Sequence, residues 1–269
     1  MYKSPAYVQN EKRVVSFGYK IVTPDEGMLA CGEYGQGRFP DVTLILRAIE
    51  RELDKANDMQ GKRVMVTAGP TREAIDAVRY VSNRSSGKMG YALAQNAVER
   101  GADAILVSGP VNQSPVPGAE LINTETAEDM ARAVQDNLDR TDIFIMAAAV
   151  ADYSPTVSAS HKLKKKNENL SIDFAPTADI LQTAAEKKGQ RIHVGFALET
   201  HNADANARDK LEKKNCDLVV LNRLGDKGAA FDVDTNKVTL FFKDGNEENL
   251  PLMSKKMVAE EILNRIIKL

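Results

Sequence analysis

The chain has 269 residues, of which 43% are hydrophobic, and no apolar run approaches the roughly 18 residues of a membrane span. Lys and Arg (36) nearly balance Asp and Glu (38), so no overall basic field favours nucleic acid, and anion binding must come from local clusters. The two cysteines and the lack of a signal peptide fit the reducing cytoplasm, where a disulfide framework is not expected.

Residues 1–59 do not follow the rhythm of the rest of the chain. We expect a helix beginning within 2–10, a short strand at 19–22, a glycine-rich loop over 27–38 and a helix over 43–55. This is too little for an independent core, so the segment is interpreted as the tail end of something larger. The predicted boundary lies at Gln60-Gly61, with a second domain over 60–269.

From Lys62 onward, short apolar or β-branched runs alternate with helical patterns, which is typical of a parallel sheet with helices on both faces. The expected strands are 64–67, 104–108, 143–147, 192–196 and 218–221. The expected helices are 87–100, 127–138, 178–187 and 203–214, with Thr126 and Thr177 as N-caps. A strand over 237–242, a Lys-Asp-Gly-Asn turn and a helix over 255–267 follow. The predicted fold class is α/β, a Rossmann-like three-layer fold with a mainly parallel sheet plus a C-terminal hairpin and helix.

A segment of small residues, 82–90, precedes the first helix of this region. Ser85 or Ser86 is placed to cap that helix, and the free N–H groups at a helix start favour phosphate. Ser85, Ser86, Gly87 and Lys88 are therefore candidate ligands of a phosphorylated substrate. The alternative is that serines and glycines simply end a loop before an amphipathic helix.

Ligands of an open parallel sheet bind beyond the carboxyl ends of its strands. Four loops of small or polar residues follow the first four expected strands, namely 67–73, 108–110, 148–152 and 197–200. We expect these loops to converge on one rim, although any α/β domain has loops there.

Four lysines are candidates for neutralising a triphosphate. Lys162 and Lys164 share a face if their stretch is extended, and Lys210 and Lys214 lie one helical turn apart. A lysine ammonium serves phosphate oxygens as a point charge, although a solvated surface is the commoner fate of each. Asp152 is a candidate ligand for a divalent metal or a ribose hydroxyl, against the alternative of a simple turn residue.

Asn83 is placed to orient a carboxylate or an acyl phosphate, with a plain turn as the alternative. The three histidines show no metal-like spacing, so no zinc site is predicted. Cys216 begins an apolar run and is predicted to be a buried small hydrophobe, whereas flexible loop residues around Cys31 suit a mobile, exposed thiol.

A series of ordered blocks together resembles bacterial phosphopantothenoylcysteine synthetase over residues 60–269. The blocks are 67–73 with Asp76, 78–80, 82–90, 107–110, 148–153, 162–165, 195–200 and 214–215. The resemblance implies a ligase of coenzyme A biosynthesis in which CTP activates 4'-phosphopantothenate as an acyl-cytidylate and releases pyrophosphate. L-Cysteine then attacks to give phosphopantothenoylcysteine and CMP. It also implies Mg²⁺ on the triphosphate and a homodimer. The balanced charge and the lack of a long apolar run predict no nucleic acid or membrane partner.

The resemblance assigns roles residue by residue. Lys162 supports formation of the acyl-cytidylate and belongs to the nucleotide site, Asn83 contacts the acyl intermediate and aids its conversion, and Ala148 belongs to the backbone stretch that reads cytosine. The other nucleotide-contacting positions are Met146, Ala147, Asp152, Ala178, Asp179, Ile180, Leu181, Phe196, Lys210 and Lys214. Residues 177–180 read Thr-Ala-Asp-Ile, a departure from the family's usual Asn-Pro-Asp-Ile. Asp152 is the candidate metal ligand.

Residues 1–59 resemble the end of phosphopantothenoylcysteine decarboxylase, through 1–6, 24–25, Gly27 and 30–38. That FMN-dependent flavoprotein commonly precedes the synthetase in one bifunctional chain. The resemblance makes Cys31 the acid that protonates an enethiolate intermediate, from a flap over the substrate. Because the FMN-binding body and its catalytic histidine would precede Met1, we expect a fragment of the bifunctional protein without decarboxylase activity, in which Cys31 is idle.

Two other functions stay open at this point. A dinucleotide-dependent oxidoreductase requires Gly-x-Gly-x-x-Gly after the first strand and an acidic residue ending the second, whereas this chain has Ala-Gly-Pro-Thr-Arg-Glu and Ser-Gly-Pro there. A non-catalytic partner subunit would use the loops only to bind another chain. The joint presence of Lys162, Asn83 and Asp152 argues against the second alternative.

Overall fold

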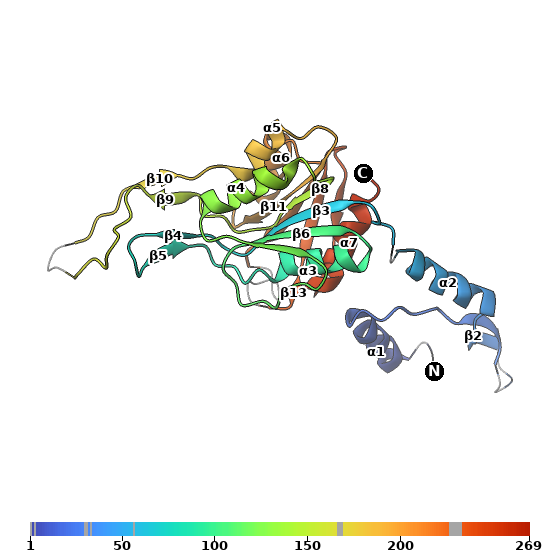
Figure 1. The fold of residues 1–269 in the computed structure, drawn as a ribbon. Helices are drawn as coiled ribbons and strands as arrows, with labels where there is room; N and C mark the ends of the chain where they lie inside the picture. Colours follow the sequence, from blue (N-terminus) through green and yellow to red (C-terminus); the bar gives the residue numbers. More distant parts are fainter. Residues whose placement is uncertain are drawn as a thin grey trace. The chain divides into compact units, whose positions relative to one another are not determined.

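Figure 1 shows the computed structural model of the chain, which describes residues 2, 4–29, 32, 34–55, 57–165, 169–225 and 233–269. Contacts between residues divide the chain into two units, Met1–Asp58 and Met59–Leu269. Each unit has its own internal contacts and is described by itself. Among the described residues, none of the helices has the length and apolarity that crossing a membrane requires.

The first unit consists of two helices and a hairpin between them. Its elements are α1 (Pro5–Ser16), β1 (Asp25–Met28), β2 (Tyr34–Arg38) and α2 (Val42–Lys55), with β1 and β2 antiparallel. Both helices were predicted, but the strand expected at 19–22 was wrong, and a hairpin occupies most of the predicted glycine-rich loop. β1 and β2 contain glycines, so their composition does not predict strands. Short strands of this kind form because they pair with each other rather than because of residue propensity. Cys31 lies outside the described residues.

The second unit is built on an eight-stranded sheet in the order β15-β14-β12-β11-β8-β3-β6-β7. Its strands are β3 (Arg63–Ala68), β6 (Asp103–Ser108), β7 (Glu120–Asn123), β8 (Ile143–Met146), β11 (Ile192–Glu199), β12 (Leu218–Arg223), β14 (Val238–Phe242) and β15 (Glu247–Asn249). All pairs from β7 to β12 are parallel, and β14 and β15 add an antiparallel hairpin at one edge. The predicted fold class is confirmed, including the C-terminal hairpin.

Helices cover both faces of this sheet (Figure 1). The helices on one face are α3 (Lys88–Glu99) and α7 (Lys255–Ile266), and those on the other are α4 (Ala127–Leu138), α5 (Ile180–Glu186) and α6 (Ala203–Lys213). Successive residues of a strand face opposite cores: Val64 and Val66 pack toward α3 and α7, and Met65 packs toward α4. Because both faces are covered, the central strands are apolar throughout, which is the pattern that predicted them.

Two helix starts can be compared with their predicted caps. Thr126 is the N-cap of α4 and forms a capping box with Asp129, which confirms that prediction. Neither Ser85 nor Ser86 caps α3, so that prediction was wrong. The N-cap is Gly87, whose φ of 75° lies in the left-handed region that glycine tolerates best, and no side chain caps the helix. Helix α3 therefore starts on a glycine rather than on a capping side chain.

Thr177 was also predicted wrongly as an N-cap. Asp179 caps α5 by accepting a hydrogen bond from the Gln182 N–H (2.9 Å). The Thr177 hydroxyl instead donates to the Ala151 carbonyl (2.6 Å). A side-chain oxygen caps the helix that starts directly after it, and here the start of α5 falls at Ile180 rather than 178.

Two short antiparallel sheets form arms beside the main sheet in Figure 1, and neither was predicted. In one, β4 (Arg72–Ala74) pairs with β5 (Tyr80–Ser82), and in the other, β9 (Tyr153–Pro155) pairs with β10 (Phe174–Pro176). The arms touch through β4 and β9. A third pair, β13 (Thr235–Asn236) with β16 (Met253–Ser254), leads into α7.

Candidate active site

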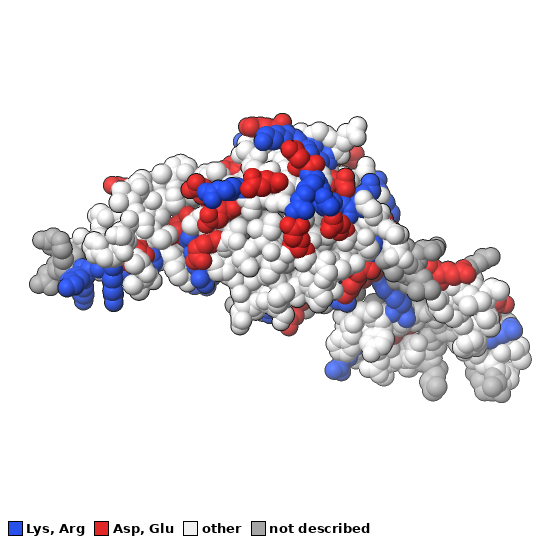
Figure 2. Space-filling model, viewed as in Figure 1, with Lys and Arg blue, Asp and Glu red and all other residues white. Residues whose placement is uncertain are grey.

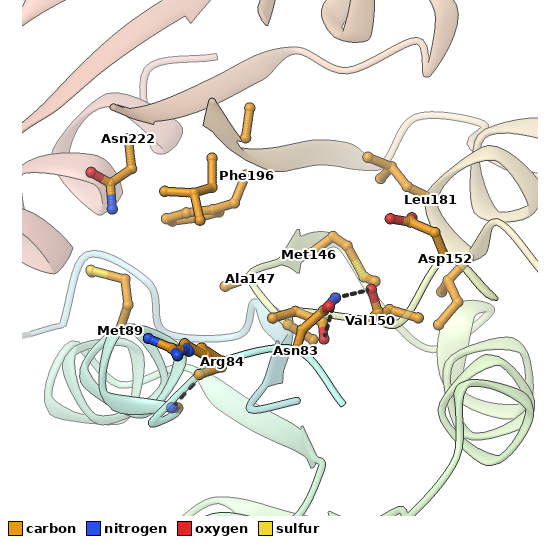
Figure 3. Close-up of a pocket in the computed structure, with 18 of the residues that line it drawn as sticks. Asn83, Arg84, Met89, Met146, Ala147, Val150, Asp152, Leu181, Phe196 and Asn222 are labelled. Atoms are coloured by element: carbon orange, nitrogen blue, oxygen red, sulfur yellow. Dashed lines mark hydrogen bonds between the residues drawn. The ribbon is translucent and has the colours of Figure 1, made fainter. Parts of the chain in front are cut away.

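A cavity of about 770 Å³ lies at the carboxyl ends of β8, β11 and β12, beside the start of α3 (Figure 3). Segments far apart in the sequence line it, namely 83–90, 146–150 with Asp152, 177–181 and 196–198, together with Lys210, Lys214, Asn222, Asn236 and Lys255. In Figure 3, Asn222 and Met89 lie at one end, Asp152 and Leu181 at the other, and Asn83 between them. This is the position at which an open parallel sheet binds ligands.

Most of the predicted site residues line this one pocket. They are Asn83, Ser85, Ser86, Gly87 and Lys88 at the start of α3; Met146, Ala147, Ala148 and Asp152 after β8; and Ala178, Asp179, Ile180, Leu181, Phe196, Lys210 and Lys214 on the opposite wall. Lys162 is not among the lining residues. It lies in the connection between β9 and β10. Cys31, the remaining candidate, lies outside the described residues.

Only two of the four loops predicted to form the rim line the pocket. Loops 148–152 and 197–200 contribute lining residues, whereas Arg72 of 67–73 and Pro110 of 108–110 line a neighbouring hollow that shares Ser85, Ser86 and Lys88 with this pocket. Loops 67–73 and 108–110 also pack closely against each other. A Cβ atom on Gly109 would lie 1.8 Å from the Pro70 carbonyl oxygen, so their backbones meet directly. These loops support the pocket from outside its surface.

Two buried threonines show how that support works. The Thr67 hydroxyl accepts a hydrogen bond from the Ala148 N–H (3.2 Å), and the Thr71 hydroxyl accepts one from the Ala151 N–H (3.0 Å). Both threonines are fully buried, and the Ala149 N–H donates to the Gly69 carbonyl (2.8 Å). Hydrogen bonds therefore fix the backbone that follows β8 at successive positions. The polar groups of this backbone that are not used in these bonds stay available to a ligand.

Asn83 joins the two halves of the pocket. Its side-chain Nδ2 donates to the carbonyl oxygens of Val150 (2.8 Å) and Ala149 (3.4 Å), as the dashed lines in Figure 3 show. The residue is exposed and lines the cavity. A single carboxamide thus holds the loop before α3 against the loop after β8.

Two lysines are held in the wall formed by α5, α6 and β11. Lys210 Nζ donates to the Phe196 carbonyl (2.6 Å), and burial lowers the pKa of its ammonium from the usual value. Lys214 Nζ lies 2.7 Å from Asp179 Oδ2. Burial raises the pKa of Asp179, but hydrogen bonds from Lys214 and the Gln182 N–H outweigh burial and lower it. Both ammonium groups are therefore held at fixed points, and the charge of Lys214 is paired with that of Asp179.

Asp152 is the acidic residue of the loop after β8 that lines the pocket, and it is exposed there. Within the described ranges, no three or more His, Cys, Asp or Glu residues gather in a group that could hold a metal ion. Magnesium in nucleotide sites is held by one or two carboxylates together with substrate phosphates. The donors at Asp152 thus fit a nucleotide-bound magnesium rather than a metal site made of protein alone.

Cys216 is fully buried in the core beneath α5 and α6, as predicted. Burial raises the pKa of its thiol to about 11, so the sulfur stays protonated near neutral pH. It serves as a small hydrophobe.

The pocket is also lined by Met89, Asn222, Asn236 and Lys255, none of which was predicted from the sequence as a site residue. Asn222 lies near the carboxyl end of β12, and its Oδ1 is buried with no hydrogen-bond partner among the described residues. Ligands bind beyond the carboxyl ends of parallel strands, so the end of the fifth expected strand, 218–221, would have pointed to Asn222. Asn236 and Lys255 come from β13 and the start of α7, where no sequence signal points to a pocket.

Comparisons with known proteins agree with this architecture. The family of the DNA/pantothenate metabolism flavoprotein C-terminal domain matches residues 59–269. A coenzyme A biosynthesis bifunctional protein of Bacillus subtilis is 46% identical over 272 residues, which cover 100% of this chain and 67% of that protein. The corresponding Haemophilus influenzae protein is 40% identical over 269 residues, with the same coverage.

Solved structures show the same fold. The crystal structure of the C-terminal domain of a coenzyme A biosynthesis bifunctional protein gives a TM-score of 0.69 at 43% identity, and the alignment covers 79% of this chain and 97% of that one. A Cab2 variant in complex with phosphopantothenate-cysteine gives 0.64 at 17% identity, covering 81% of this chain and 89% of that one. The second likeness concerns the fold alone.

Proposed function

Because this chain belongs to the DNA/pantothenate metabolism flavoprotein C-terminal domain family, we propose that it is a ligase that joins 4'-phosphopantothenate to L-cysteine, with CTP as the activating nucleotide. One observation carries the proposal. A single pocket unites the start of α3, the backbone after β8 and the lysines of α6, which are the parts that a phosphorylated substrate and a nucleotide require.

The first step activates a carboxylate, which is a poor acyl donor because its leaving group would be an oxide. In the proposed reaction, a carboxylate oxygen of 4'-phosphopantothenate attacks the α-phosphorus of CTP, and pyrophosphate leaves. Residues 146–148 and 178–181 bind the nucleotide beside Lys210 and Lys214, and the start of α3, whose N-cap is Gly87, holds the substrate phosphate. The product of this step is a mixed acyl-cytidylate anhydride.

The second step forms the amide. The amino nitrogen of cysteine attacks the acyl carbon, CMP leaves, and the nitrogen loses a proton. Asn83 lies between the two halves of the pocket, where its carboxamide can hold the acyl group while the nucleophile arrives. Asp152 would hold a magnesium ion whose charge, when bound, neutralises the triphosphate oxygens.

Nucleotide choice tests the proposal directly. We expect phosphopantothenoylcysteine to form from 4'-phosphopantothenate and cysteine with CTP, and the acyl-cytidylate to accumulate when cysteine is omitted. Product would be measured by mass spectrometry with each of the four nucleoside triphosphates in turn. Product with ATP and none with CTP would contradict the nucleotide assignment, and no product with any nucleotide would contradict the ligase assignment.

An Asn83→Asp variant should separate the two steps. The change replaces an N–H donor by a carboxylate oxygen that faces the Ala149 and Val150 carbonyls. The acyl group then loses its support, and the rate of amide formation should fall by about 10²-fold, the effect of losing one transition-state donor. We expect the acyl-cytidylate to accumulate in the presence of cysteine, with amide formation slow. Rapid-quench assays follow both species.

The matched control for this variant is Asn246→Asp. Asn246 is exposed in the turn between β14 and β15, its Nδ2 also donates a hydrogen bond, to Asp244 (2.6 Å), and it does not line the pocket. The control should leave both rates within about twofold of the parent chain, because surface changes are usually small in effect. An equal loss of both steps in Asn83→Asp would be inconsistent with the role assigned to Asn83.

A further inference from the structure

Asp76 carries a buried charge at the turn between β4 and β5, outside the pocket. Its side chain has 0% exposure, and its Oδ1 accepts hydrogen bonds from the backbone N–H groups of Val78 (2.9 Å) and Arg79 (2.8 Å). The Arg79 guanidinium bonds to Oδ2, with Nε at 3.0 Å. Asp76 thus shapes its own turn through one carboxylate oxygen and is neutralised through the other.

The second oxygen also reaches a distant segment. Asp76 Oδ2 accepts a hydrogen bond from the Leu163 N–H (3.0 Å), and Arg79 donates to the Leu163 carbonyl (2.9 Å). Both backbone polar groups of Leu163 are therefore bound by one Asp–Arg pair. The Ala159 N–H donates to the Ile75 carbonyl (3.1 Å), which adds a second tie between the same two segments.

These ties act on the residues that flank Leu163. Leu163 is partly buried, whereas Lys162 and Lys164 on either side are exposed. Figure 1 shows the connection between β9 and β10 extending alongside the β4–β5 arm, and Figure 2 shows Lys and Arg side chains gathered at that end of the molecule. An exposed, positively charged connection without regular secondary structure would otherwise sample many conformations.

The charge state of the anchor is stable. The hydrogen bond from Arg79 holds the pKa of Asp76 far below its usual range, against the opposing effect of burial, and the N–H groups of Val78 and Leu163 add to it. Asp76 therefore stays ionised throughout the pH range in which the protein would work. A buried carboxylate without its partners would be costly, so the contact is strongly specified.

We infer that Asp76 is a positioning residue for Lys162, which it fixes by holding Leu163 through the Asp76–Arg79 pair. The inference rests on the proposed function, in which Lys162 supports formation of the acyl-cytidylate. Neither Asp76 nor Lys162 lines the nucleotide pocket, so loss of the anchor should lower the rate of activation and leave the pocket's own contacts with the nucleotide in place. Asp76 and Arg79 would thus affect the reaction through Lys162, although neither residue lines the pocket.

Asp76→Asn in the 269-residue chain tests this inference. The amide keeps an acceptor for the turn but presents N–H donors to Leu163 and Arg79, which are donors themselves. We expect kcat for CTP-dependent pyrophosphate release to fall by roughly 10²-fold, the scale of a misplaced catalytic group, with KM for CTP within about twofold. Trypsin should cut faster after Lys162, Lys164 and Lys165, as followed by mass spectrometry.

Two further variants make the test specific. Leu163→Pro removes the N–H that Asp76 accepts while Asp76 itself stays, so it should reproduce both effects. Asp129→Asn is the matched control, since Asp129 also accepts bonds from a backbone N–H and a side chain, but at the cap of α4. The control should leave kcat and tryptic cleavage after Lys162 and Lys164 unchanged.

The outcomes separate this inference from the proposed function. A parent chain that releases no pyrophosphate with any nucleotide would overturn the proposed function, and the positioning role with it. An active parent chain whose Asp76→Asn variant keeps its kcat and its cleavage rate would overturn the positioning role alone. Faster cleavage throughout the second unit, with kcat and nucleotide affinity falling together, would also overturn it by showing general loss of structure.

Discussion

A Lys162→Gln chain is expected to form neither the acyl-cytidylate nor phosphopantothenoylcysteine. Glutamine keeps a polar end but removes the positive charge, and negative charge grows on the pyrophosphate as it leaves. Lys210 and Lys214 are already bound to Phe196 and Asp179, whereas the Lys162 ammonium has no partner within the part of the chain that the structure describes. We expect the activation rate to fall by about 10³-fold, at the upper end of the loss of one electrostatic stabiliser.

The measurement is pyrophosphate release without cysteine, together with mass spectrometry of the trapped cytidylate. Lys213→Gln is the matched control, because Lys213 is an exposed lysine of α6 that pairs with Asp209 and does not line the pocket. Its activity should stay within about twofold of the parent chain. A Lys162→Gln chain that activates normally would mean that the pocket is complete without this lysine.

Sequence and structure give different information about Lys162. The sequence pattern assigns Lys162 to the nucleotide site by resemblance, whereas the pocket lining does not include it. What the structure adds is the anchor at Leu163, which no pattern in the sequence shows, because Asp76 and Leu163 are 87 positions apart. Long-range hydrogen bonds of this kind depend on the fold and have no local signal.

The main sheet could be predicted because its central strands are apolar on both faces. β3, β6, β8, β11 and β12 are short apolar runs separated by helical patterns, so their existence and their parallel orientation follow from this alternation. The arms could not be predicted in this way. β4 reads Arg-Glu-Ala and β9 reads Tyr-Ser-Pro, and neither alternates, because these strands are set by pairing with their partners rather than by burial.

The position of the site followed from the rule on strand ends, but its finer geometry did not. Thr126 has a capping box that the sequence spells out, so its N-cap was predictable. At α3 the serines were the obvious choice, yet the left-handed conformation of Gly87 decides the helix start. The only sequence signal of a positive φ is the glycine itself, and a glycine can also be present for other reasons, such as a close approach of two backbones.

The largest structural effect is expected from Gly109→Ala. A Cβ atom at this position would lie 1.8 Å from the Pro70 carbonyl oxygen and 2.9 Å from its carbon, and both are backbone atoms that cannot rotate away. Pro70 forms a β-bridge with Ala149, whose N–H donates to the Gly69 carbonyl. The methyl group must therefore push the 67–73 loop, and the pocket backbone after β8 moves with it.

Overpacking of this kind costs about 1–3 kcal/mol, which corresponds to a Tm about 2–12 °C lower for a unit of this size. Gly35→Ala is the control, because the nearest atom to its Cβ is a Leu29 side-chain carbon at 4.0 Å and its backbone is an ordinary strand. Calorimetry and CTP titration measure both effects. Since the Pro70 carbonyl adjoins the bridge to Ala149, the Tm and the nucleotide affinity should fall together in Gly109→Ala. A lower Tm with unchanged affinity would show that the 67–73 loop moves without the pocket, and that its support of the backbone after β8 is dispensable for binding.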